Sequence, residues 1–208
     1  MPATEDLIRS LSRTAGQGRD RRGMALMAAI LAALVVAGLM LVFWIGLRPG
    51  LGALMLGQAY LFKAAVTLAL AGAGILLVRR AGRPESHRLG FVVLLPALAL
   101  LAFGILTDGS DQPLRGHSGV SARVCVSSIL AMAVPALALI LAALRTAAPT
   151  RLGRAGAAAG LLAGSLGAAV YTLACVNDGR MFVAVWYSVA ILIMTGLGAL
   201  AGRRALAW

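Results

Sequence analysis

The sequence predicts an all-α polytopic membrane protein with six transmembrane helices and both termini in the cytoplasm of a bacterium. Three observations support this fold class. Hydrophobic residues make up 61% of the 208-residue chain and charged residues only 12%, a composition too apolar for a soluble globular domain. Six segments are long enough to cross a bilayer. The arginines between these segments gather in alternate gaps, which is the pattern that sets membrane orientation.

The predicted spans each approach the length of about 20 mainly apolar residues that a helix needs to cross the hydrocarbon core. In lipid, the backbone polar groups must be satisfied within each helix, so helices are the expected spanning form. The third segment is the shortest and contains Pro96, where we expect a kink. The six predicted spans are Met24–Gly46, Tyr60–Val78, Leu89–Leu106, Val124–Leu144, Ala155–Cys175 and Met181–Ala201.

The basic residues divide the chain into three parts. There are 19 Lys+Arg against 7 Asp+Glu, and the arginine-rich stretches are the N-terminal tail, the second and fourth gaps and the C-terminal tail. This division predicts a cytoplasmic tail over residues 1–23, a transmembrane domain over 24–201 and a cytoplasmic tail over 202–208. Nucleic-acid binding would need a basic face on a soluble fold, so no direct contact with nucleic acid is predicted.

The N-terminal tail has the pattern of a short amphipathic helix. Thr4 is a good N-cap residue, and Asp6 adds negative charge to the first turn. Leu7, Ile8 and Leu11 then fall on one face. Such a helix can lie on the lipid surface or place its apolar face in the groove of a partner protein, and both interpretations stay open.

Lys63 is the only lysine and lies within the second predicted span, near its outer end. We expect its long side chain to extend to the outer interface, where the ammonium group stays hydrated. The alternative is an internal ion pair with Asp108 or Asp111, which follow the third span on the same side of the membrane.

The two cysteines open the fourth predicted span (Cys125) and close the fifth (Cys175). Because these spans run in opposite directions, both thiols are expected at the periplasmic end, at similar depth. The bacterial periplasm is oxidising, so they could form a disulfide if their Cα atoms come within about 7 Å. They could also share a soft metal ion or serve as small buried hydrophobic residues. The sequence assigns no metal and predicts no cofactor.

Two further patterns concern packing and the membrane interface. Gly156, Gly160 and Gly164 repeat every four residues in the fifth span, a spacing that lets helix backbones approach closely, within the chain or between subunits. Aromatic residues near the outer helix ends are typical of an interfacial belt. These are Trp44, Tyr60, Phe62, Phe182, Trp186 and Tyr187.

The sequence lacks the motifs of common enzyme classes, such as GxxxxGKS/T, HExxH or GxSxG, and we predict that the protein is not an enzyme. A membrane thiol oxidoreductase is an alternative, but relaying electrons to quinone needs two cysteine pairs. A small transporter is a second alternative, but no span has a carboxylate in its middle.

Several short stretches along the chain together match one known family, and the last third of the chain is the most similar. The matching stretches are Asp6-Leu7-Ile8, Gly46-Leu47-Arg48-Pro49, Phe62-Lys63, Cys125, Gly160-Leu-Leu-Ala-Gly164, Tyr171, Cys175, Phe182-Val-Ala-Val-Trp186-Tyr187 and Leu206-Ala207-Trp208. In these stretches the chain resembles the NrsF family of six-span bacterial anti-sigma factors. Ala174 stands where family members often have a histidine, and Asn177-Asp178 follow the second cysteine.

The resemblance implies a protein of the bacterial inner membrane that holds an extracytoplasmic-function sigma factor away from RNA polymerase. An oxidative or heavy-metal signal in the periplasm would act on Cys125 and Cys175 and release the sigma factor. Asp6, Leu7, Ile8 and Leu11 would then form the sigma-docking helix. The partners expected are the sigma factor and the lipid bilayer, and the oligomeric state is not readable from the sequence.

Overall fold

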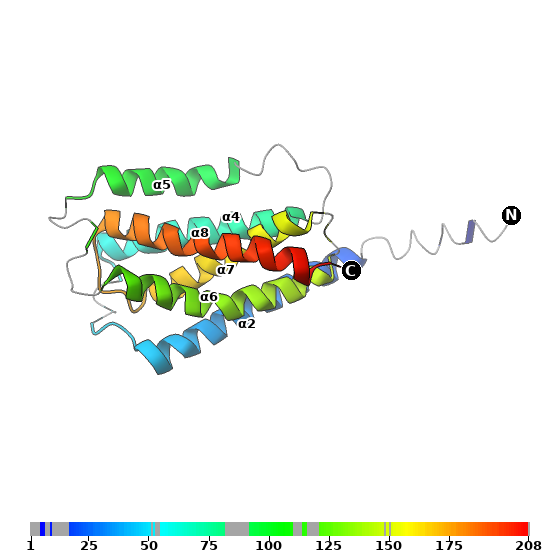
Figure 1. Cartoon of the computed structure of the whole chain (residues 1–208), viewed down its shortest axis with the longest axis horizontal. Helices are drawn as coiled ribbons and strands as arrows, with labels where there is room; N and C mark the ends of the chain where they lie inside the picture. Colours follow the sequence, from blue (N-terminus) through cyan, green and yellow to red (C-terminus); the bar gives the residue numbers. More distant parts are fainter. Residues whose placement is uncertain are drawn as a thin grey trace.

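The computed structural model is an all-α bundle (Figure 1), which confirms the all-α part of the prediction. It describes residues 5–6, 9, 17–50, 52, 55–81, 92–109, 114–115, 121–147, 149 and 151–207. Within these residues there are six principal helices, and short π and 3₁₀ segments adjoin the first and third of them. The elements are α2 (Gln17–Met40), η1 (Leu41–Ile45), α4 (Gln58–Ala81), η2 (Val92–Leu94), α5 (Leu95–Leu106), α6 (Ala122–Arg145), α7 (Leu152–Tyr171) and α8 (Arg180–Ala205).

Four of the described helical stretches are long and apolar enough to cross a membrane, and Val92–Leu106 forms a shorter apolar helix. The four are Gly23–Ile45, Gln58–Ala81, Ala122–Arg145 and Arg180–Ala205. Large hydrophobic side chains are exposed along these helices, as at Leu31, Leu68 and Leu192. A water-soluble protein rarely exposes so many, so this surface is suited to lipid.

The helix α7 is the centre of the bundle and is not among the four. It packs against α8, α4, α6 and α2, and most of its residues are buried. A helix surrounded by protein does not need the apolar surface of a lipid-facing one, because its neighbours replace the lipid. Its glycines and alanines serve close packing instead. By contrast, α5 lies at the edge of the bundle against α4 and α8 (Figure 1).

The glycines of α7 fit against α8, so the expected packing role is confirmed and the neighbour lies within the chain. A Cβ atom on Gly160 would collide with the Met194 carbonyl oxygen and lie 2.9 Å from the Thr195 Cα atom. On the facing helix, a Cβ atom on Gly198 would lie 2.8 Å from the Gly160 Cα atom. The backbones of α7 and α8 are therefore in direct contact, and we call this contact the glycine seam.

Two local predictions were wrong. Pro96 does not kink its helix, because it lies in the first turn of α5, where the missing N–H has no partner to lose. The fifth helix ends at Tyr171, so Cys175 lies in the loop between α7 and α8 and does not close a span. Leu173 and Ala174 extend the apolar run beyond the end of the helix, and hydropathy does not detect that end.

Successive helices run antiparallel, so the loops that follow α2, α5 and α7 meet at one end of the bundle. Arg48 donates its backbone N–H to the Leu173 carbonyl oxygen at 3.1 Å. The Met181 backbone N–H donates to an Asp108 carboxylate oxygen, also at 3.1 Å. We call this the Cys175 end. At the opposite end α2 begins and α8 finishes (Figure 1).

Candidate functional site

Two groups of polar side chains lie next to each other at the Cys175 end. The first, the ion-pair cluster, consists of Arg48, Lys63 and Asp178. The second, the thiol cluster, consists of Cys125, Tyr171, Cys175 and Tyr187. Five segments of the chain contribute: the turn after η1, the helices α4, α6 and α8, and the end of α7 with its following loop.

The turn after the first helix positions Arg48. The π segment η1 ends at Gly46, whose φ of 82° is in a region that favours glycine. Gly50 has a φ of 72°, in the same region. Between them, the Arg48 backbone N–H is hydrogen bonded to the loop that contains Cys175. The side chain of Arg48 therefore starts beside that loop.

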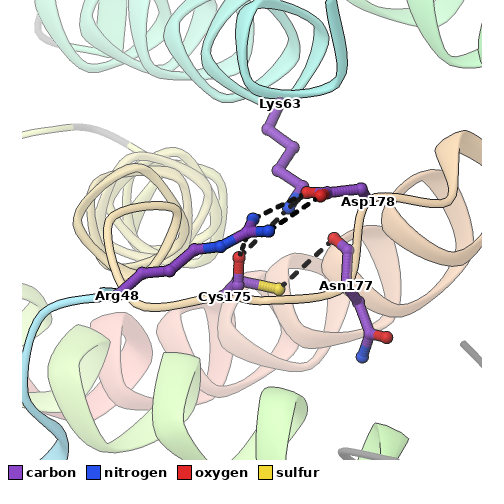
Figure 2. Close-up of polar contacts among 5 residues, drawn as sticks. All are labelled: Arg48, Lys63, Cys175, Asn177 and Asp178. Atoms are coloured by element: carbon purple, nitrogen blue, oxygen red, sulfur yellow. Dashed lines mark hydrogen bonds and ion pairs between the residues drawn. The ribbon is translucent and has the colours of Figure 1, made fainter. Parts of the chain in front are cut away.

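Asp178 is the common partner of two cations that approach from different segments (Figure 2). The guanidinium group of Arg48 donates to both carboxylate oxygens, at 2.9 and 3.0 Å. The ammonium group of Lys63 donates to Oδ1 at 2.9 Å. This bidentate geometry is the strong form of an arginine–carboxylate contact.

The same two cations also contact the backbone of Cys175. Its carbonyl oxygen accepts hydrogen bonds from Lys63 Nζ at 3.2 Å and from Arg48 Nη1 at 3.4 Å. In Figure 2 the sulfur atom of Cys175 points the other way, toward Asn177, whose carbonyl oxygen lies 3.7 Å from it. The ion-pair cluster therefore fixes the backbone of the residue that carries the thiol.

The ion-pair cluster is unequal in charge and in burial. It contains two positive groups and one carboxylate, and Lys63 is 1% exposed whereas the Asp178 side chain is 43% exposed. Burial of Asp178 acts to raise its pKa, but the hydrogen bonds from Arg48 and Lys63 outweigh it, so the pKa lies below its ordinary value. Asp178 is therefore ionised at neutral pH, and the cluster keeps one unbalanced positive charge.

The expectation that Lys63 extends to the interface was wrong, because its side chain is fully buried. The internal ion pair was the better interpretation, but its partner was misassigned. Asp108 accepts the Met181 backbone N–H, and Asp111 lies outside the described residues. The loop after α7 brings Asp178 to Lys63, and a charge pattern along the sequence does not show how that loop folds.

The thiol cluster is buried and closely packed. Cys125 and Cys175 are 0% and 2% exposed, both are free thiols, and their side chains interact directly. The Tyr171 hydroxyl donates to the Cys125 sulfur at 3.5 Å. The rings of Tyr171 and Tyr187 are tilted by 54°, with centroids 6.2 Å apart. Among the described residues no group of three or more His, Cys, Asp or Glu side chains could hold a metal ion.

Sequence reasoning brought the two cysteines to one end of the bundle but missed most of their surroundings. Arg48 is the single basic residue of its gap and part of an NrsF-like stretch, but neither observation predicts its contact with Asp178. Tyr187 was assigned to the aromatic belt with Phe62 and Phe182, and all three are buried. Trp44, at 78% exposed, is consistent with the belt. A phenol one residue from a tryptophan at a helix end gives no local sign of burial.

The tail residues are only partly described. Asp6 is helical and exposed. Leu7, Ile8 and Leu11 lie outside the described residues, so the predicted apolar face stays a prediction.

Comparison with known proteins identifies the family. The chain matches NrsF, described as negative regulator of sigma F, over residues 11–208. The chain belongs to the NrsF family. It is 37% identical over 212 residues to the anti-sigma-F factor NrsF of Caulobacter vibrioides, and 31% identical over the same length to the probable anti-sigma-F factor NrsF of Azospira oryzae. Each comparison covers 99% of both chains. No solved structure matches this chain significantly.

Membership confirms the predicted resemblance and places the chain in a family of regulators, not of enzymes. The match begins at residue 11, so it includes Leu11 but not Asp6, Leu7 or Ile8. The NrsF-like stretches of the sequence are far apart along the chain. In the structure Arg48, Lys63, Cys125, Cys175 and Tyr187 come from five of them and meet at the Cys175 end.

Proposed function

We propose that this protein is a transmembrane anti-sigma factor that senses a periplasmic signal through Cys125 and Cys175. It would hold an extracytoplasmic-function sigma factor at the inner membrane and release it when an oxidative or heavy-metal signal changes the two thiols. The observation that carries this proposal is a pair of free thiols in direct side-chain contact, next to ion pairs that join separate segments. Sigma binding is supported by the names of the two relatives.

The proposed topology has six spans with both termini in the cytoplasm. It is supported by the arginine distribution and by the arrangement in which α2 begins and α8 ends at the end opposite Cys175. The central position of α7 explains how it can cross the membrane with a less apolar composition. Reporter fusions that are active only in the periplasm test this, and activity after residue 110 but not after residue 208 is expected. Activity at residue 208 would contradict it.

The coupling between thiols and tail is proposed to run through the first helix. Arg48 is joined to the Cys175 loop by a backbone hydrogen bond, by its ion pair with Asp178 and by the bond to the Cys175 carbonyl. A change in that loop therefore acts on the chain at one end of α2, and the tail lies at the other. Transmission requires two discrete helix arrangements, each favoured by one thiol state.

The docking helix is tested by changing Leu7, Ile8 and Leu11 to Ala in the full chain. Apolar anchors on one helix face carry groove binding, so capture of the sigma factor should fall at least about tenfold. A matched control changes Ser10, Ser12 and Thr14 to Ala in the same tail, and it should bind normally. Unchanged capture by the leucine–isoleucine variant would reject the docking helix.

The switch is tested by replacing both cysteines with Ser. The double variant should still repress the sigma-dependent promoter, and repression should persist when oxidant or heavy metal is added. A normal response in this variant would reject the cysteine pair as the sensor.

A further inference from the structure

We infer that the two cysteines have different chemical roles: Cys175 reacts first with the oxidant and Cys125 resolves the product, while Lys63 and Tyr187 position and stabilise the reacting sulfur. This inference rests on the proposed oxidative switch and specifies its chemistry. It follows from the unequal surroundings of two thiols that are in contact.

The first difference is charge. The buried ammonium group of Lys63 shares one carboxylate with Arg48, so the cluster has one positive charge more than its anion can balance. A buried charge without a full counter-ion is costly, and a negative charge forming nearby is favoured. Lys63 is hydrogen bonded to the Cys175 backbone, and its charge acts on the Cys175 sulfur. A thiolate at Cys175 would therefore complete the charge balance.

The second difference is an unused hydrogen-bond donor. Within the described part of the chain, the Tyr187 hydroxyl is the buried side-chain polar group without a hydrogen-bond partner. It lies near the Cys175 sulfur without meeting hydrogen-bond geometry, and the two groups influence each other's charge. A buried donor that makes no hydrogen bond costs about 1–3 kcal/mol. A thiolate accepts hydrogen bonds far better than a thiol does, so ionised Cys175 would give Tyr187 the partner that it lacks.

Cys125 has different surroundings. It lies within α6, fully buried, and its sulfur already accepts a hydrogen bond from Tyr171. It shares an apolar core with Ile129 and Phe182, and Cys175 borders the same core. Cys175 instead lies in the loop after α7, beside the half-exposed Asp178 and within reach of Arg48. Both thiols are buried, but the loop thiol is nearer to the charged groups of the ion-pair cluster.

The chemistry balances with a hydroperoxide as the oxidant. The Cys175 thiolate attacks one peroxide oxygen, the O–O bond breaks, and hydroxide leaves and takes a proton to become water; Cys175 is now a sulfenic acid. The Cys125 sulfur then attacks the Cys175 sulfur, the S–O bond breaks, and the departing hydroxide takes the Cys125 proton. Two thiols and one hydrogen peroxide give one disulfide and two waters.

The experiment compares single-cysteine variants of the purified full-length protein in detergent, without any sigma factor. The rate of alkylation by iodoacetamide is measured from pH 5 to 10. In Cys125→Ser, the remaining Cys175 should react at least about tenfold faster at pH 7 than Cys125 does in Cys175→Ser. With hydrogen peroxide, dimedone should trap a sulfenic acid on Cys175 and not on Cys125.

The role of Lys63 is separated from loop mobility by the pH profile. In the Cys125→Ser background, Lys63→Met keeps the Arg48–Asp178 pair intact but removes the extra charge. The alkylation profile should move to higher pH, with a loss of about tenfold in rate at pH 7, whereas Lys63→Arg should restore it. Tyr187→Phe should shift the profile in the same direction by a smaller amount. A variant that only loosened the loop would react faster at every pH.

Three results would overturn the inference: equal or faster alkylation of Cys125, an unchanged profile in Lys63→Met, or dimedone trapping on Cys125. These readouts need no sigma factor. If the thiols behave as expected but oxidation fails to release the sigma factor, the proposed function fails and the assignment of the two thiols stands.

Discussion

The glycine seam and the ion-pair cluster hold the same bundle together by opposite means. In the seam, α7 and α8 meet backbone to backbone at Gly156, Gly160 and Gly198. In the cluster, two cationic side chains from segments far apart in the sequence meet on the Asp178 carboxylate beside a thiol. The glycine seam depends on the absence of side-chain atoms between the two backbones, whereas the ion-pair cluster depends on charge. Protonation or oxidation can change that charge.

This difference separates the part of the molecule that must stay fixed from the part that can respond. The loop between α7 and α8 carries Cys175 and Asp178, and the glycine seam holds the two helices on either side of that loop. A chemical change in the loop therefore cannot be absorbed by separating α7 from α8. It is directed instead at Arg48 and Lys63, on the segments that the loop contacts.

The largest effect is expected from Gly160→Leu in the seam. The new side chain would meet the Met194 and Thr195 backbone, which cannot move aside as a side chain would. Overpacking typically costs about 1–3 kcal/mol, and we expect a loss of stability at or above the upper limit. Thermal unfolding in detergent measures it. The matched control is Gly196→Ala on α8, where a Cβ atom meets nothing within 4 Å, and it should melt as the unchanged protein does or slightly higher.

The second-largest loss of stability is expected from Asp178→Asn in the ion-pair cluster. It removes the anion shared by two cations and leaves Lys63 buried without its counter-ion. Breaking a fully buried pair costs about 3–5 kcal/mol, but Asp178 is partly exposed, so we expect about 1–3 kcal/mol. Thermal unfolding again measures it. The double variant with Lys63→Met should lose less than the sum of the two single losses, and strict additivity would show that the pair is not coupled.

The smallest effect is expected from pH. Since the pKa of Asp178 is lower in the folded protein than its ordinary value of 3.8, its contribution to stability is fully present above that value. The contribution is lost as pH falls through the folded pKa. The gap in melting temperature between the unchanged protein and Asp178→Asn should thus be constant from pH 6 to 5 and narrow below about pH 4. A gap that is the same at pH 3 and pH 6 would contradict the ion pair.

The sequence predicted the helices better than it predicted the loops. The run from Ala122 to Arg145 is apolar enough to be identified as a helix by length alone, and hydropathy placed it within two residues at the start and one at the end. The α7 boundary was misplaced because Leu173 and Ala174 are apolar yet belong to the turn. Helix ends depend on local backbone hydrogen bonds, which average hydropathy does not report.

The site was predicted in part. The antiparallel order of the helices was sufficient to bring Cys125 and Cys175 together, because it follows from counting spans. The partner of Lys63 was not predictable in the same way, since Asp108 and Asp178 both lie at the Cys175 end. Choosing between them needs the path of the loop after α7, which Arg48 helps to fix through its bond to Leu173.

The composition of α7 also bears on how the protein is made. A helix rich in glycine and alanine gains less from entering lipid than its neighbours do, so in the proposed six-span arrangement it would partition weakly by itself. The loop to α8 is short, and α8 is apolar enough to span a membrane. We therefore expect α7 to leave the translocon with α8 as a helical hairpin, which would make the glycine contacts between them among the earliest to form during biogenesis.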